Sequence, residues 1–165
     1  MKLRVEVISD KGLVRSHNED EALVCSRFMR DESFAGEFDT NVHSRFTALV
    51  ADGLGGQAGG ELASDMALLS FDDFLTDLPD DLSPVDFRER VEEWVQRCHR
   101  EIIGKGCELP QFGDMGTTLV GIFCYEDHLY SINVGDSRLY RFRGGQLMPF
   151  SVDHSMRNLK KDNTC

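Results

Sequence analysis

Between residues 48 and 60 the chain reads Ala48-Leu49-Val50-Ala51-Asp52-Gly53-Leu54-Gly55-Gly56-Gln57-Ala58-Gly59-Gly60. The short apolar run predicts a buried strand over Ser44 to Ala51, and the glycines that follow are too many for the interior of an element. A carboxylate at the tip of a buried strand is poorly solvated, so it is usually paired or bound to a metal. Asp52 is therefore a candidate site residue, although an Asp-Gly turn that only links strand to helix explains the same pattern.

The segments on either side of this loop alternate between strand and helix patterns. Apolar residues at helical spacing predict helices over Glu61 to Leu78 and over Pro84 to Ile103, the second one stopped by glycines 104 and 106. Enrichment in β-branched and aromatic residues predicts strands over residues 3–8 and 21–28, and again over 117–125, 128–134, 138–143 and 146–150. Three strands, two helices and four strands are not a βαβ alternation. The order predicts an α+β fold of two stacked antiparallel sheets with the helix pair outside.

Composition limits the classes of partner. The formal net charge is −11, which argues against nucleic acid and against an anionic membrane as the main partner. The first residues, from Met1 to Glu6, carry charges where a signal peptide needs an apolar stretch. The five cysteines are scattered and form no CxxC pair, so neither a thiolate zinc site nor a redox motif is predicted. We expect a cytoplasmic protein with reduced thiols.

Two further segments combine strand ends with charged residues. The first runs from Asp10 through Arg15 to Glu19 and Asp20, and taken alone it could be a charged turn. The second begins at Gly116-Thr117-Thr118 and continues to Val134-Gly135-Asp136-Ser137-Arg138, where a hairpin turn with a surface ion pair is the plain alternative.

Taken together and in this order, the segments resemble the metal-dependent (type 2C, PPM) protein serine/threonine phosphatases, most closely their short bacterial members. The resemblance rests on D-x-G-x-x-R-x-x-N-E-D, D-G-x-G-G-x-x-x-G-E-x-A-S, G-T-T, V-G-D-S-R-x-Y and D-H-S, which together extend from Asp10 to Ser155. It implies a single phosphatase 2C-like domain over residues 1–165, an α-β-β-α sandwich with helix pairs outside two stacked sheets. We expect this sandwich to be incomplete at its C-terminus.

The resemblance also implies roles for individual residues. Asp52 is similar to the carboxylate that bridges two divalent ions, and the carbonyl of Gly53 to a further ligand. Asp20 resembles the carboxylate that holds the cluster directly or through water, with Glu19 as the acidic residue beside it. Arg15 resembles the arginine that grips the substrate phosphate, and Asp136 a ligand of the third, weaker ion of bacterial members.

The residue types agree with that chemistry. Carboxylate and carbonyl oxygens are hard ligands that suit Mn²⁺ or Mg²⁺, and two such ions activate a water for attack on phosphorus. Arg15 offers a permanently charged, bidentate fork for phosphate oxygens. The implied activity is hydrolysis of phosphoserine and phosphothreonine in phosphorylated proteins, with a cognate serine/threonine kinase as the functional counterpart.

The sequence departs from the family in two places. Leu54 stands where some members carry a histidine proposed as general acid, and His17 and His154 are more simply explained as structural or solvent-facing residues. The family's later S/C-D-G and G-x-D-N motifs, which carry further metal-binding aspartates, are missing, since Asp162-Asn163 has no glycine before it. We therefore expect a chain that lacks about half of the family's metal ligands.

Two other functions stay open at this stage. Gly53-x-Gly55-x-x-Ala58 formally matches a dinucleotide fingerprint, but Asp52 would repel a pyrophosphate and a second helix follows where a strand is required. The other is a non-catalytic, phosphatase-like module that binds a phosphoprotein or a partner without turnover.

Overall fold

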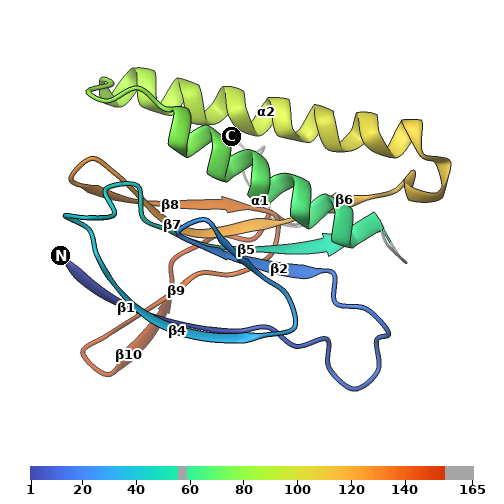
Figure 1. Ribbon diagram of the computed structural model, residues 1–165, viewed down its shortest axis with the longest axis horizontal. Coiled ribbons are helices and arrows are strands. Elements are labelled where there is room, and N and C mark those ends of the chain that lie inside the picture. Colours follow the sequence, from blue (N-terminus) through green and yellow to red (C-terminus); the bar gives the residue numbers. More distant parts are fainter. Residues whose placement is uncertain (56–58, 155–165) are drawn as a thin grey trace, which may run out of the picture.

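The computed structural model describes residues 1–55 and 59–154 (Figure 1). Ala58, Ser155 and the Asp162-Asn163 pair of the sequence arguments lie outside this part. The elements within it are β1 Lys2–Ile8, β2 Asp20–Val24, β3 Arg27–Met29, β4 Ser33–Asp39, β5 Thr47–Leu54, α1 Gly59–Asp77, α2 Pro84–Glu108, a 3-10 turn Pro110–Phe112, β6 Gly116–Thr117, β7 Leu119–Tyr125, β8 His128–Val134, β9 Tyr140–Arg143 and β10 Gln146–Pro149.

One antiparallel sheet organises the molecule. Its strands run in the order β3-β2-β5-β7-β8, and the short strand β6 pairs with β5 beside β7. Helices α1 and α2 cover one face of this sheet, and the antiparallel pair β1–β4 lies against the other (Figure 1). The α+β prediction with stacked antiparallel sheets is therefore confirmed.

Strand residues alternate between two hydrophobic cores, because successive side chains of a strand point to opposite faces. Leu23, Leu49 and Phe123 face the helices, where they pack with buried residues such as Phe71 and Trp94. On the other face Ala22, Val24, Met29, Phe46 and Cys124 pack against the β1–β4 pair. By the same alternation Asp20 lies on the face of Ala22, away from the helices.

The strands before the glycine loop differ from the sequence prediction. Residues 21–28 do not form one strand but a hairpin of β2 and β3, turning at Cys25 and Ser26 with φ of 46° and 62°. Neither residue is a glycine, so the turn left no strong signal. Strand β4 was not predicted at all, although it pairs with β1 along its whole length. Five strands, not three, precede the helices.

The helices also run differently from the expectation. Helix α2 continues through Gly104 and Gly106 and ends before Pro110, where a proline disfavours helix in the preceding residue. Because α1 leads directly into α2 and no parallel strand follows β5, the described part of the chain has no βαβ unit for a dinucleotide.

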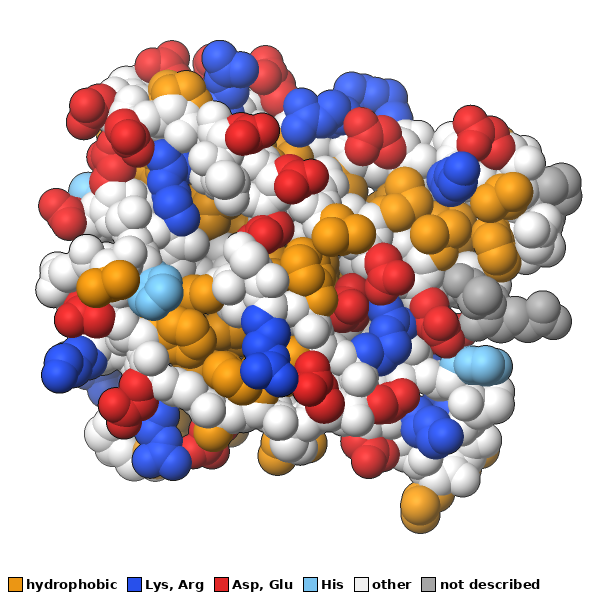
Figure 2. Space-filling model, viewed as in Figure 1, with side chains coloured by type: hydrophobic (Ala, Val, Ile, Leu, Met, Phe, Trp, Pro, Cys, Tyr) orange, Lys and Arg blue, Asp and Glu red, His pale blue; other side chains and the backbone are white. Residues whose placement is uncertain are grey.

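The helical layer carries many charged side chains (Figure 2). Figure 2 shows acidic and basic side chains interspersed along the helical layer on the face that it draws, as in a solvated helical surface. No helix within residues 1–55 and 59–154 is long and apolar enough to cross a membrane.

Candidate functional site

Asp20 and Asp52 lie directly opposite each other on the neighbouring strands β2 and β5. Next to them the amide of Gly53 donates to the carbonyl of Glu19 at 3.2 Å. Since the Glu19–Gly53 pair carries the hydrogen bond, Asp20 and Asp52 occupy a non-hydrogen-bonded position, where facing side chains come closest. Two acidic motifs that are far apart in the sequence thus converge on one face of the sheet.

Asp52 does not stand at a strand tip, as the sequence predicted, but inside β5, which continues to Leu54. The strand is extended because β6 pairs with its last residues, Gly53 with Thr117 and Leu54 with Gly116. The amide of Asp52 donates to Thr118 Oγ1 at 3.1 Å, and its carbonyl accepts from Thr118 N at 2.9 Å and from Thr117 Oγ1 at 3.1 Å. The threonines of the G-T-T motif therefore fix the backbone of Asp52.

Sequence reasoning missed this positioning role of Thr118. The Thr118 hydroxyl also lies 2.7 Å from the hydroxyl of Ser137, which connects Asp52 to the segment that carries Asp136. At Gly135 a Cβ would meet the Thr118 side chain at 2.7 Å, so the two segments approach more closely than a larger residue allows. The order G-T-T followed by V-G-D-S was a visible signal, but it did not say which atoms meet.

The charge on Asp52 is disfavoured in this setting. Partial burial raises the pKa of the Asp52 carboxyl above its ordinary value, and Asp20 raises it further through its negative charge and a shared hydrogen bond. Asp136 acts in the same direction, while Arg15 opposes the shift. The charges of Asp20, Asp136 and Arg15 thus all act on the Asp52 carboxyl. A bound cation would relieve the repulsion between the acids.

Glu19 is turned toward the helix layer. Its side chain is 13% exposed and lies 3.8 Å from the guanidinium of Arg15, which is 68% exposed. A Cβ on Gly60 would come within 2.7 Å of the Glu19 carboxylate, so the first turn of α1 closes over this side chain. The structure thus brings Glu19 to Arg15 and to α1, while Asp20 faces Asp52.

Gly53 makes the close approach of β5 to α1 possible. A Cβ at this position would lie 2.1 Å from the carbonyl oxygen of Gly60 and 2.7 Å from that of Glu19. No side chain larger than hydrogen fits between these backbone atoms. The glycine is needed for packing, in addition to the ligand role that the family resemblance implies for its carbonyl.

The side chains of Asp20 and Asp52 suit a hard divalent cation, because their oxygens are carboxylate oxygens and the charge on Asp52 is disfavoured without one. They are few, however. Within residues 1–55 and 59–154, no three histidine, cysteine, aspartate or glutamate side chains gather closely enough to hold a metal ion. The described residues therefore fit a divalent cation, but they supply only two carboxylates of such a site.

Neither candidate histidine reaches the acidic pair. His17 Nδ1 lies 3.4 Å from Glu61 on α1, with most of its ring exposed. His154 binds the backbone of Gly135 twice, its amide donating to the carbonyl at 2.9 Å and its Nδ1 accepting from the amide at 3.3 Å. Both contacts are structural in kind.

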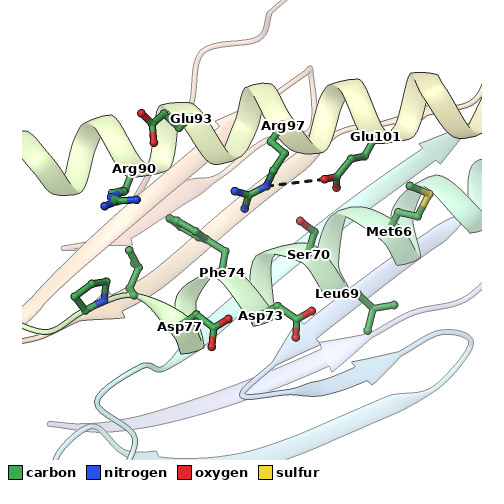
Figure 3. Close-up of a pocket in the computed structure, with 12 residues that line it drawn as sticks. Met66, Leu69, Ser70, Asp73, Phe74, Asp77, Arg90, Glu93, Arg97 and Glu101 are labelled. Atoms are coloured by element: carbon green, nitrogen blue, oxygen red, sulfur yellow. Dashed lines mark ion pairs between the residues drawn. The ribbon is translucent and has the colours of Figure 1, made fainter.

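A hollow of about 700 Å³ lies elsewhere, between the two helices (Figure 3). Asp73 and Asp77 line it from α1, and Arg97 and Glu101 from α2, where they form an ion pair at 3.9 Å. Since the acidic pair faces away from the helices, this hollow and the pair are on different layers of the molecule.

Comparison with known proteins gives one consistent family. The sequence profile of "Protein phosphatase 2C" matches residues 27–159. The serine/threonine phosphatase stp of Listeria monocytogenes is 30% identical over 158 residues, which cover 93% of this chain and 56% of the Listeria protein. The serine/threonine protein phosphatase PstP of Mycobacterium tuberculosis is 33% identical over 151 residues, covering 92% of this chain and 25% of that protein.

Solved structures agree with these relatives. The crystal structure of the Mycobacterium tuberculosis phosphatase PstP/Ppp matches with a TM-score of 0.69 at 28% identity, covering 98% of this chain and 58% of that one. The catalytic domain of PstP in complex with two manganese ions matches with a TM-score of 0.68 at 27% identity, covering 98% and 60%. The chain thus spans a little over half of the Listeria protein and of these two structures. By its sequence profile and its fold, the chain belongs to the protein phosphatase 2C family.

Proposed function

We propose that the protein is a metal-dependent phosphatase that removes phosphate from phosphoserine and phosphothreonine in proteins. The observation that carries the proposal is the opposition of Asp20 and Asp52 across β2 and β5, within electrostatic reach of Arg15. Family membership supports the reaction class, since the relatives named above are serine/threonine phosphatases. A cognate kinase that forms the phosphorylated substrates, and action in the cytoplasm, belong to the same proposal.

Asp20 and Asp52 would hold the cation, which we propose to be Mn²⁺ or Mg²⁺. The solved relative with two manganese ions supports Mn²⁺ as the metal and two as the number of ions. Asp136 is the candidate ligand of a third, weaker ion. When bound, the ions supply positive charge and lower the pKa of a coordinated water. Gly53 allows the close backbone packing at this point, and Thr118 keeps Asp52 in register.

Arg15 would bind the substrate phosphate. Its guanidinium is exposed, and its one ion pair in the described part of the chain, with Glu19 at 3.8 Å, is long. A planar guanidinium can donate two parallel hydrogen bonds to phosphate oxygens. Glu19 would then limit the directions in which Arg15 points, since its own carboxylate is held against α1.

The test is dephosphorylation of phosphoserine and phosphothreonine peptides by the natural gene product that contains these residues, with Mn²⁺ and with a chelator. We expect turnover with Mn²⁺, abolished by the chelator and by Asp52→Ala. For the 165-residue chain by itself we expect weak Mn²⁺ binding and background hydrolysis of p-nitrophenyl phosphate, because cation affinity follows the number of anionic oxygens. Phosphopeptide binding without turnover in the gene product would instead identify a non-catalytic module.

A further inference from the structure

Arg30, at the end of the β2–β3 hairpin, belongs to none of the motifs, yet its side chain is only 20% exposed. Its Nη1 donates to the carbonyl of Asn18 at 2.7 Å, and its Nη2 donates to Ser64 Oγ at 3.1 Å. It also forms an ion pair with Asp65 of α1. One guanidinium therefore joins the segment just before Asp20 to the first turns of α1.

The segment that Arg30 holds is fixed from its other side as well. Asn18 is 5% exposed, and its Nδ2 donates to Ser9 Oγ and to Asp31 Oδ1, both at 2.9 Å. Its Oδ1 accepts from the amide of Asp20 at 3.2 Å. The buried Asn18 thus accepts from Arg30 through its backbone carbonyl and from the amide of Asp20 through its side-chain oxygen.

Ser64 completes the connection to the acidic pair. Its hydroxyl is fully buried and donates to the carbonyl of Glu19 at 2.8 Å, the same carbonyl that accepts from the amide of Gly53. Arg30 therefore supports the pairing of β2 with β5 through two neighbours, Asn18 and Ser64.

We propose that Arg30 is a positioning residue that keeps Asp20 opposite Asp52. It touches neither carboxylate, and it acts by holding residues 18–20 against α1. The part of this inference that concerns a cation rests on the proposed function, while the part that concerns the strand register does not.

Lysine could not substitute for Arg30, because an ammonium group cannot reach a carbonyl, a hydroxyl and a carboxylate in the fixed fork geometry of a guanidinium. Arg30 also lies 3.7 Å from the buried Glu21, whose Oε2 has no hydrogen-bond partner within the described residues. Removing Arg30 would leave Glu21 and Asp65 without the cation beside them. A loss of stability is therefore expected in addition to any effect on the site.

A matched control separates the two effects. Arg45 is 22% exposed and donates to the carbonyls of Leu75 and Leu78 at 2.8 and 2.7 Å and to Asp80 at 2.6 Å. Like Arg30, it joins backbone carbonyls and a carboxylate through one guanidinium, but at the other end of α1. Arg45→Met should therefore lower stability without changing the β2–β5 register at Asp20.

The experiment measures two properties of the 165-residue chain in the wild type, Arg30→Met, Arg30→Lys and Arg45→Met. The first is hydrogen exchange of the Gly53 amide without metal, and the second is Mn²⁺ affinity by electron paramagnetic resonance. Both are measured where all variants are folded. In both Arg30 variants we expect Gly53 exchange to be at least roughly tenfold faster than the change in global stability explains. We also expect Mn²⁺ affinity to be roughly tenfold weaker, the lower end for loss of an outer-shell partner.

The inference is overturned if Arg30→Met leaves Gly53 exchange as in the wild type, or if Arg45→Met changes it equally. The part that concerns the cation is overturned if Gly53 exchange rises while Mn²⁺ affinity stays within twofold of the wild type. If the wild-type chain binds no Mn²⁺ at all, the proposed cation site is contradicted, and Gly53 exchange alone then decides whether Arg30 sets the register.

Discussion

Asp20 faces Asp52 across two antiparallel strands, at a position where no backbone hydrogen bond separates their side chains. A like-charged pair in this arrangement costs stability unless something positive lies between or beside it. The protein retains it at the end of the β2–β5 pair, where the next position on the same face is apolar, Ala22 opposite Val50. This cost is the physical reason to regard the pair as a site rather than as part of the fold.

Asp52→Asn should therefore stabilise the metal-free chain by about 0.5 kcal/mol, since it removes one of two facing charges. Asp20→Asn should have the same effect. The double variant should gain little beyond either single one, because the repulsion is already relieved. Urea unfolding with chelator present measures all three, and a clear loss of stability in either single variant would mean that the carboxylates are held by contacts that the pair itself does not explain.

Gly53→Ala should destabilise the fold by about 3 kcal/mol, because the new Cβ would meet the backbone of Gly60 at 2.1 Å. Gly104→Ala is the control, since this helical position in α2 has no atom within 4 Å of an added Cβ. That variant should gain about 0.5–1 kcal/mol from the better helix former. Denaturant unfolding of both proteins distinguishes a packing requirement from a general sensitivity of glycines, which would appear as losses in both.

Arg15→Ala should leave stability nearly unchanged, because the side chain is mostly exposed and its ion pair is long. In the active gene product, the KM for a phosphopeptide should rise roughly tenfold or more, with a smaller fall in kcat, as expected for loss of a charge-assisted phosphate contact. Arg4→Ala removes another exposed ion-paired arginine, on β1, and should change neither constant. A large fall in kcat at unchanged KM would give Arg15 a different role.

The buried cysteines predict how stability depends on alkaline pH. Burial raises the pKa of the Cys98 and Cys124 thiols above their ordinary value, so the folded protein keeps them protonated where the unfolded chain ionises. Their contribution is complete below the pKa of an unfolded thiol, roughly 8.5, and is lost as pH rises through the higher folded value. The free energy of unfolding should fall between pH 8 and 10, less steeply in Cys124→Ala than in the wild type.

A labelling experiment checks the same point independently. The exposed Cys107 should react with a thiol reagent in the native chain, while Cys98 and Cys124 should react only after unfolding. The pH dependence in Cys107→Ala should match that of the wild type. Equal reactivity of all three thiols in the native state would contradict the burial on which the pH argument rests.

The sequence predicted correctly those elements whose ends are marked by residues typical of turns. Strand β8 has the expected bounds, His128–Val134, because a tight turn at Glu126 and Asp127 separates it from β7. The β2–β3 hairpin was mistaken for one strand, since Cys25 and Ser26 make the turn without glycine or proline. Helix α2 overran two glycines because helical neighbours and packing outweigh their propensity.

The site was readable in residue types but not in contacts. The motifs identified Asp20 and Asp52 as acidic residues at strand ends, and the register that makes them face each other comes from pairing over a long separation. The bond from the Asp52 amide to Thr118 spans 66 positions, and no local pattern reports it. Arg30 lies in none of the motifs, and only its contacts in the folded chain indicate its positioning role.

The most direct test of the account is a Mn²⁺ titration of the 165-residue chain by electron paramagnetic resonance, for the wild type, Asp52→Asn and Asp73→Asn. Asp73 lies on α1, in the hollow between the helices, and so controls for weak binding to surface acids. The account predicts weak binding by the wild type, the same affinity in Asp73→Asn, and no measurable binding in Asp52→Asn while the variant stays folded. Wild-type affinity in Asp52→Asn would show that the cation is held elsewhere, and would contradict the assignment of the Asp20–Asp52 pair as a metal site.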